Sequence, residues 1–269
     1  MATSEAEFEQ AVGVGEPEPS DQGEEETGAT MTLVEHLEEL RRRILICAVA
    51  IVLGSVVGFI FREQILSVLT LPLPPESVGL KTGTGTQYNL VVLGVGEAFT
   101  VFLKLSVAVG ICLAAPVILY EVWAFVAPGL TGRERRWAGP FVIVGLGLFL
   151  AGLAVGYFTL RFPVQWLINF GRGDFLELVT ADNYFTFIAF FMLAFGIVFE
   201  LPLILTFLAQ IGVVSSQLLR RKRVVALVIL WILSTFLTPG TDPYSPIVLG
   251  TAMTVLYELS ILMIRVTKK

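Results

Sequence analysis

The sequence has little charge and few residues of the kinds that bind metal ions or form disulfides. Only 15% of its 269 residues are charged, and it contains one histidine, His36, and two cysteines, Cys47 and Cys112. A typical soluble domain carries about 25% charged residues. Both cysteines lie in apolar segments, where a free thiol behaves as a small hydrophobe. We therefore expect neither a disulfide framework nor a metal site.

Motifs for nucleotide binding and for hydrolysis are also missing. No phosphate-binding loop, GxGxxG element or G-x-S-x-G element occurs in a suitable context. Their absence argues against an ATP-driven pump and against a hydrolase. We expect no enzymatic activity and no cofactor, and we expect no nucleic-acid partner.

Long apolar segments dominate the chain instead. Apolar residues make up 55% of it, and the mean hydropathy is +0.80. Several runs approach or exceed the roughly 18 apolar residues that mark a membrane-spanning helix. The sequence predicts an all-α integral membrane protein with six transmembrane helices, at residues 44–61, 97–126, 138–160, 184–210, 224–237 and 247–264.

Two of the predicted helices contain a proline that favours a kink. Pro116 lies in the second helix and Pro202 in the fourth, and a proline removes a backbone donor and clashes with the preceding turn. The fifth helix, residues 224–237, is only about 21 Å long at 1.5 Å per residue, against a hydrocarbon core of about 30 Å. Either flanking residues extend it or the bilayer thins around the fifth and sixth helices.

Basic residues are distributed unequally between the two sides of the predicted spans. Thirteen Lys and Arg lie on one side and four on the other, while Lys104 lies inside a span. The positive-inside rule then predicts that both termini are cytoplasmic. The outer loops would include residues 62–96 and 162–183. No convincing inverted repeat relates the two halves, which argues against the usual secondary-transporter architecture.

The N-terminal segment differs in composition from the rest of the chain. Residues 1–30 contain eight Glu, one Asp and no Lys or Arg, and they have too few apolar side chains to order themselves. The segment lacks the basic start and apolar core of a signal peptide. We predict a disordered acidic tail at residues 1–31 and one membrane domain at residues 32–269. A solvated tail is favoured over a docking segment.

Two acidic residues occur on the predicted cytoplasmic side among arginines. In "HLEELRRRI", Glu39 stands four residues before Arg43, and in "GLTGRERRWAGP", Glu134 stands between arginines. The first segment alone is typical of an interfacial helix anchored by basic residues. Topology needs only the arginines, however, so Glu134 has no role in setting it. Carboxylates bind the planar guanidinium in two-point contacts, and we expect both groups to be exposed and able to accept guanidiniums from a partner.

Glu200 is the charged residue expected at the greatest depth in the membrane. It lies sixteen residues from the outer end of the fourth span in "AFGIVFELPLIL", and an ionisable group at such depth usually has a function or a partner. The alternative is a protonated glutamic acid that is hydrogen-bonded in helix packing. The other acidic groups of the spans are expected to be structural. Glu97 is expected to pair with Lys104, while Glu121 and Glu258 lie near the cytoplasmic ends.

Four stretches resemble the TatC family, the multispanning subunit of the twin-arginine protein translocase. They are "HLEELRRRI", "APVILYEVWAFVAPGLTGRERR", "FGIVFELP" and "LTPGTDPYSP", and the resemblance covers about residues 32–264. It implies a cupped bundle of six helices with a concave face. It also implies recognition of folded cargo that bears an Arg-Arg signal peptide, and transport driven by the proton-motive force. The implied partners are TatA/TatB-type single-span proteins, signal peptides, membrane lipid and further copies of the chain in a homo-oligomer within a larger complex.

The resemblance also assigns roles to particular residues. Glu39 and Glu134 correspond to the carboxylates that bind the signal arginines, with Arg41, Arg43, Arg135 and Arg136 as accompanying basic positions. The positions that correspond to contacts with a partner or with the signal helix are Glu200, Phe125, Pro116, Pro72 and Asp242. An alternative function stays open, namely a proton-coupled solute transporter with Glu200, Lys104 and Glu97 as its relay. A membrane-embedded enzyme would need a metal or nucleophile cluster that the sequence lacks.

Overall fold

A computed structural model describes residues 33–73, 90–126, 138–170, 179–240 and 242–267 of the chain. The chain divides into two units, Met1–Glu38 and Glu39–Lys269, and the arrangement described below is that of the second unit. Within the described residues the regular elements are helices, apart from one isolated β-bridge between Val91 and Thr180. The fold is therefore all-α.

The helices follow the apolar segments of the sequence, with short polar helices between them. They are α1 (Leu33–Ile60), α2 (Arg62–Leu69), α3 (Glu97–Val126), α4 (Ala138–Thr159), α5 (Arg161–Phe170), α6 (Ala181–Val198), α7 (Leu201–Gln210), α8 (Ser216–Arg221), α9 (Arg223–Leu237) and α10 (Tyr244–Thr267).

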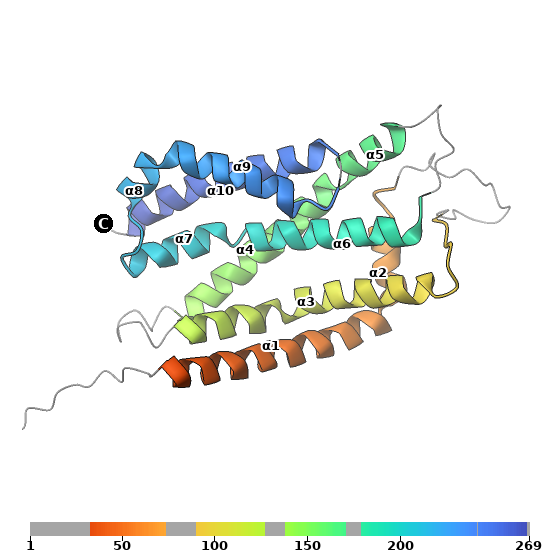
Figure 1. Ribbon diagram of the computed structural model, residues 1–269, viewed down its shortest axis with the longest axis horizontal. Helices are drawn as coiled ribbons and strands as arrows, with labels where there is room; N and C mark the ends of the chain where they lie inside the picture. Colours follow the sequence, from red (N-terminus) through yellow and green to blue (C-terminus); the bar gives the residue numbers. More distant parts are fainter. Residues whose placement is uncertain (1–32, 74–89, 127–137, 171–178, 241, 268–269) are drawn as a thin grey trace, which may run out of the picture. The chain divides into compact units, whose positions relative to one another are not determined.

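The core of the second unit lies around α6. In Figure 1, α6 and α7 lie end to end, with α10 on one side and α3 on the other. Helix α4 packs against both α3 and α6, and α9 packs on α10. Large apolar side chains of α6 and α10 fill the centre and are almost fully shielded from solvent, among them Ile188, Phe191, Phe195, Leu249 and Met253.

Five stretches of helix in the described residues are long and apolar enough to cross a membrane. They are Val34–Ile60, Glu97–Phe125, Gly139–Phe170, Ala181–Gln210 and Tyr244–Val266. Each contains or closely matches one of the predicted spans. The remaining predicted span is the shorter apolar helix α9, of 15 residues. The structure thus has five candidate spans and one short apolar helix, and six crossings with both termini inside stay a prediction.

The predicted outer loops contain helices that the sequence did not indicate. Helices α2 and α5 occupy parts of the segments expected at 62–96 and 162–183. Tyr157 and Tyr184 fix the end of α2, since their hydroxyl groups donate to the backbone oxygens of Val68 and Leu69 at 2.9 Å each. These two segments are therefore partly helical and packed rather than open loops.

The predicted kink in the fourth span is confirmed, whereas α3 runs through Pro116 as one helix. Helix α6 ends at Val198 and α7 begins at Leu201, with Pro202 in the first turn of α7. Between them the Glu200 N–H donates to the Ile197 oxygen at 3.1 Å. This bond spans three residues instead of the four of an α-helix, so the turn is tighter. Because proline lacks an N–H, it suits a first helical turn and disrupts the turn before it. This break positions Glu200.

Glycines allow α1 to approach α3 closely. A Cβ on Gly54 would lie 2.7 Å from the Gly110 oxygen, and a Cβ on Gly58 would lie 3.0 Å from the Ser106 oxygen. Small residues spaced four apart are typical of such close crossings between membrane helices. The crossing brings the part of α1 around Arg43 alongside the last turns of α3.

Candidate functional site

An arginine of α1 joins two carboxylates at the C-terminal part of α3. Arg43 Nη1 donates to Glu121 Oε2 at 2.8 Å, and its Nε donates to Glu39 Oε1 at 3.0 Å. Its Nη2 contacts Glu39 Oε1 and donates to the backbone oxygen of Ala124 at 2.9 Å. We call Glu39, Arg43 and Glu121 the carboxylate cluster. One guanidinium here serves two carboxylates, so the cluster keeps one negative charge.

The carboxylate cluster is shielded from solvent. The side chains of Glu39, Arg43 and Glu121 are 18%, 20% and 10% exposed. Low exposure strengthens electrostatic interactions because the effective dielectric constant falls. Glu39 Oε2 is buried and has no hydrogen-bond partner among the described residues. It is therefore an acceptor with capacity for one more donor.

An aromatic group fixes the end of α3 that carries Glu121. Trp123 packs against Phe141 of α4 with ring centroids 4.3 Å apart and against Phe207 of α7 at 5.3 Å. The Phe141 and Phe207 rings also meet edge to face at 6.0 Å. Three helices thus hold Glu121 in place, and the cluster does not depend on a mobile loop.

A small hollow opens beside the carboxylate cluster. Its volume is about 230 Å³, and it is lined by Glu39, Arg42, Arg43, Ile46, Tyr120 and Glu121. The lining combines two carboxylates and two guanidiniums with an aromatic ring and an aliphatic side chain. Such a lining suits a guanidinium on an aliphatic stem, because the head can bind carboxylates while the stem contacts apolar surface.

The cluster differs in two respects from what the sequence indicated. Glu39 was expected to be exposed, but its i,i+4 pair with Arg43 turns it inward. Glu121 was expected to be exposed at an interface, but it is buried and bound by Arg43. Arg41 is exposed, unlike Arg43. Glu134, Arg135 and Arg136 lie outside the described residues, so their predicted roles stay predictions.

Glu200 is a second acidic residue with unpaired carboxylate oxygens among the described residues. It lies at the break between α6 and α7 and is 8% exposed. Neither of its carboxylate oxygens has a hydrogen-bond partner among the described residues. Gly145 of α4 faces it, because a Cβ there would lie 3.3 Å from Glu200 Oε2 and 3.3 Å from the Leu119 side chain of α3. The predicted alternative of a carboxyl hydrogen-bonded within helix packing is therefore wrong for the described part of the chain.

The expected pair between Glu97 and Lys104 is also wrong. Lys104 Nζ donates to Asp182 Oδ1 of α6 at 2.7 Å. Glu97 instead accepts the N–H groups of Leu93 and Gly94, at 2.6 and 3.0 Å, ahead of its own helix. Asp182 lies in the first turn of α6 and Glu200 just beyond its end, eighteen residues or about 27 Å along the helix. Lys104 and Glu97 therefore do not converge on Glu200, and the relay proposed for a solute transporter is not supported.

The remaining predicted contact residues belong to three different parts of the described structure. Asp242 is buried at the start of α10, where Oδ2 accepts the Ser245 N–H at 2.6 Å and Oδ1 accepts the Ser245 hydroxyl at 2.9 Å. Both of its oxygens are therefore engaged within the chain. Pro72 is half-buried after α2, and Pro116 and Phe125 are half-buried on α3. Their contacts with partners stay predictions.

The break at Glu200, the apolar helices and the carboxylate cluster all fit one family of membrane proteins. The family model described as TatC, Sec-independent protein translocase protein, matches residues 35–251. The chain belongs to the TatC family. The resemblance seen in the sequence is confirmed.

Individual TatC proteins match over most of their length. The Sec-independent protein translocase protein TatC of Carboxydothermus hydrogenoformans is 36% identical over 239 residues, which cover 88% of this chain and 94% of that protein. The chloroplastic TATC of Arabidopsis thaliana is also 36% identical over 239 residues, covering 88% and 67%. A crystal structure of the twin arginine translocase receptor TatC is similar with a TM-score of 0.72 at 29% identity, covering 87% of this chain and 100% of that one.

Membership in the TatC family fixes the broad role of the chain. It is a multi-pass membrane component of the Sec-independent, or Tat, protein translocase, and its function is protein transport. The described residues contain no group of three His, Cys, Asp or Glu side chains placed to hold a metal ion. The carboxylate cluster and Glu200 contain buried carboxylate oxygens that are unpaired among these residues, for which a function in transport is sought below.

Proposed function

We propose that this TatC-family chain recognises twin-arginine signal peptides at the cytoplasmic face of the membrane and nucleates the export complex for folded proteins. Glu39 and Glu134 bind the two signal arginines, and Arg41, Arg43, Arg135 and Arg136 orient the carboxylates. The proton-motive force drives transport. In this arrangement both termini and the carboxylate cluster are cytoplasmic.

The unpaired carboxylate oxygen of Glu39 is the observation that carries this proposal. Arg43 binds one oxygen of each carboxylate, while the buried Glu39 Oε2 has no donor among the described residues. Leaving a buried acceptor unpaired costs about 1–3 kcal/mol. An incoming guanidinium supplies the missing donor, so a peptide arginine is a complementary ligand.

Arg43 then has a defined part in recognition. It already binds Glu39 Oε1, so it leaves Oε2 as the acceptor without a partner among the described residues, in a side chain that lines the hollow. Charge-assisted hydrogen bonds are short and directional, and arginine's planar fork makes them in parallel pairs. A lysine offers one compact charge in place of the fork, which gives a physical basis for discriminating Arg-Arg from Lys-Lys signals.

Glu200 is proposed to bind a polar group on a partner or signal helix. Its two unpaired oxygens can accept from a polar side chain that enters the membrane with a TatA/TatB-type single-span protein. In lipid such interhelical hydrogen bonds contribute about 0.6–2 kcal/mol each. Phe125, Pro116, Pro72 and Asp242 are proposed as further contacts, with several copies of the chain assembling in one complex.

Site-specific crosslinking tests the recognition role directly. A photoreactive amino acid replaces Ile46, which lines the hollow beside the cluster, and membranes with the full chain are incubated with an Arg-Arg signal peptide or its Lys-Lys counterpart. We expect crosslinks with the Arg-Arg peptide only. Glu39→Gln should weaken them about ten- to a hundred-fold, since a hydrogen bond to a charged group contributes about 1.5–3 kcal/mol.

The matched control is Glu38→Gln, which removes a neighbouring exposed carboxylate. We expect this variant to crosslink like the unmodified chain. Equal crosslinking of both peptides, or equal losses in the two variants, would show that the cluster does not recognise arginine. The cytoplasmic arginines would then serve only as topology anchors.

A further inference from the structure

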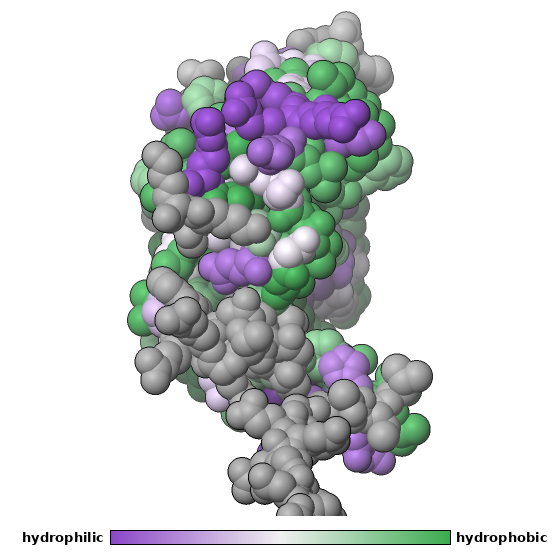
Figure 2. Space-filling model, turned by 90° about the vertical axis from the view of Figure 1, so that its left-hand side faces the viewer, coloured by the Kyte–Doolittle hydropathy of each residue, from purple (hydrophilic) through white to green (hydrophobic). Residues whose placement is uncertain are grey.

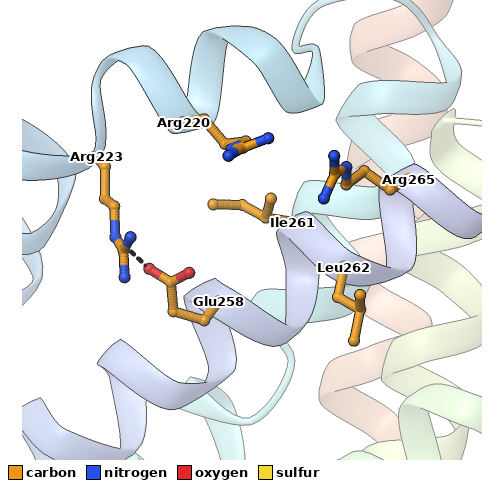
Figure 3. Close-up of a pocket in the computed structure, with 6 residues that line it drawn as sticks. All are labelled: Arg220, Arg223, Glu258, Ile261, Leu262 and Arg265. Atoms are coloured by element: carbon orange, nitrogen blue, oxygen red, sulfur yellow. Dashed lines mark ion pairs between the residues drawn. The ribbon is translucent and has the colours of Figure 1, made fainter.

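A second charged hollow lies at the other end of the sequence, where α8, α9 and α10 meet. Its volume is about 390 Å³, and it is lined by Arg220, Arg223, Glu258, Ile261, Leu262 and Arg265 (Figure 3). Arg220 belongs to the last turn of α8, Arg223 begins α9, and Arg265 lies in the last turn of α10. We call it the arginine hollow.

The arginine hollow has an excess of positive charge. Its three guanidiniums face a single carboxylate, that of Glu258. Arg223 Nε lies 2.6 Å from Glu258 Oε1, but that oxygen has no aligned hydrogen bond. Arg220 and Arg265 have no ion pair within the described part of the chain, and Figure 3 shows their guanidinium ends directed into the space above Ile261. Two positive charges are thus left for a ligand.

The arrangement of the hollow is fixed by the helices beneath it. The Tyr257 hydroxyl of α10 is buried and donates to the Leu219 backbone oxygen of α8 at 2.9 Å. The Ser215 hydroxyl accepts the Leu218 N–H at 3.1 Å and caps the start of α8. Helix α8 is therefore held against α10, so the guanidiniums are brought together before any ligand arrives.

The surroundings of the hollow are apolar and exposed. Val224, next to Arg223, is 75% exposed, while Leu262 and Val266 of α10 are 57% and 70% exposed. In Figure 2 a hydrophilic patch over α8 and the start of α9 lies beside hydrophobic surface. The hollow therefore lies at the boundary between a charged end and helix faces that suit hydrocarbon. Its ligand should have an anionic head and an apolar body.

We propose that the arginine hollow binds the phosphate head group of an anionic phospholipid. The phosphodiester accepts from the free guanidiniums of Arg220 and Arg265, and the acyl chains lie along the exposed apolar faces of α9 and α10. Arginine matches phosphate oxygens in two-point contacts, and basic pockets between membrane helices are suited to anionic lipid heads. This site is separate from the carboxylate cluster and does not depend on signal recognition.

Native mass spectrometry of the purified full chain in detergent tests the proposal. Dioleoylphosphatidylglycerol and dioleoylphosphatidylcholine are titrated separately, and the bound lipid is counted. The tested variant is Arg220→Gln/Arg265→Gln. The matched control is Arg221→Gln/Lys222→Gln, which removes two exposed charges from the same segment without touching the hollow.

We expect the unmodified chain to bind phosphatidylglycerol more tightly than phosphatidylcholine. The Arg220→Gln/Arg265→Gln variant should lose about tenfold or more in phosphatidylglycerol affinity, since each basic residue near the membrane surface contributes about 1 kcal/mol. The control variant should change by less than about threefold. Glu258→Gln should bind the lipid more tightly, because Arg223 is released from its carboxylate.

Three results would overturn the proposal. Equal losses in the two double variants would mean that only general surface charge is sensed. Equal binding of the two lipids would mean that the hollow does not distinguish an anionic head group from a zwitterionic one. Displacement of the lipid by millimolar inorganic phosphate would identify a soluble phosphate as the ligand. The gain expected in Glu258→Gln gives an independent measurement if the Arg220→Gln/Arg265→Gln variant does not fold.

Discussion

Replacing Arg43 by methionine removes its guanidinium and measures how much the ion pairs of the carboxylate cluster contribute to the stability of the fold. In Arg43→Met the aliphatic stem is kept, but Glu39 and Glu121 both lose their counter-ion. Both shielded carboxylates then lack the guanidinium that binds them. The variant should fold less stably than Glu121→Gln, in which the guanidinium still binds Glu39 and the Ala124 oxygen.

The size of the effect follows from the exposure of the partners. Breaking a buried ion pair from one side costs about 3–5 kcal/mol. Because the side chains involved retain 10–20% exposure, we expect the lower limit, about 3 kcal/mol, for Arg43→Met. Glu121→Gln keeps an oxygen that can accept from Arg43 and should cost about 1–2 kcal/mol. A chain of this size shifts its midpoint by about 2–4 °C per kcal/mol, so Arg43→Met should lower Tm by about 6–12 °C.

The assay is thermal unfolding of the purified chain in a mild detergent, followed by tryptophan fluorescence. Trp123 lies two residues from Glu121 and is buried, and it contributes to the emission together with the three other tryptophans of the chain. Arg42→Met is the control, because Arg42 is exposed and has no ion pair among the described residues. Arg43→Met/Glu121→Met should be more stable than Arg43→Met alone, since one of the two uncompensated carboxylates is gone.

Two outcomes would refute this account of the cluster. A midpoint for Arg43→Met within about 2 °C of the unmodified chain would mean that the ion pairs contribute little, as for exposed pairs. With Glu121→Met also measured alone, a midpoint for Arg43→Met/Glu121→Met that falls by the sum of the two single effects would mean that Arg43 and Glu121 act independently. Either result would also remove the argument that the cluster holds Glu39 ready for a ligand.

Three further predictions concern depth, topology and packing. Glu200→Gln should preserve crosslinking to a partner helix, whereas Glu200→Ala should reduce it; full assembly with no export in Glu200→Gln would instead indicate proton relay. A single cysteine at position 84 should react with a membrane-impermeant thiol reagent from outside, and one at position 269 only from the cytoplasm; the reverse pattern would contradict the orientation. Gly54→Leu should lower Tm by several degrees because its side chain would overlap the Gly110 backbone, while Gly147→Leu, with no atom within 4 Å of its Cβ, should not.

The helices of this chain could be predicted because apolar segments determine them locally. The second predicted span has the same bounds as α3, and the break near Pro202 follows from the missing N–H of one residue. Helices α2 and α5 were not predicted, since their sequences are mixed in polarity and contain prolines or charges at their ends. Propensity is a weak guide for such short segments, where tertiary contacts decide the outcome.

The pairing of Arg43 with Glu121 could not be predicted from the sequence. The two residues are 78 positions apart, and their contact depends on the rotation of α1 and α3 and on the close approach at Gly54 and Gly110. The same is true of Lys104, whose partner is Asp182 on another helix. In each case the sequence located an ionisable group within a span, but the choice of partner was set by helix packing.

Buried acceptors without donors connect the stability of the fold to its proposed partners. Glu39 Oε2 and both oxygens of Glu200 are shielded and unpaired among the described residues, and each such group costs about 1–3 kcal/mol. An apolar side chain of similar volume at either position would avoid this free-energy cost. A chain that keeps these carboxylates is therefore less stable alone than it would be with donors present. A signal arginine at Glu39 and a polar side chain at Glu200 would each supply a donor, so binding at either position should raise the unfolding midpoint of the chain.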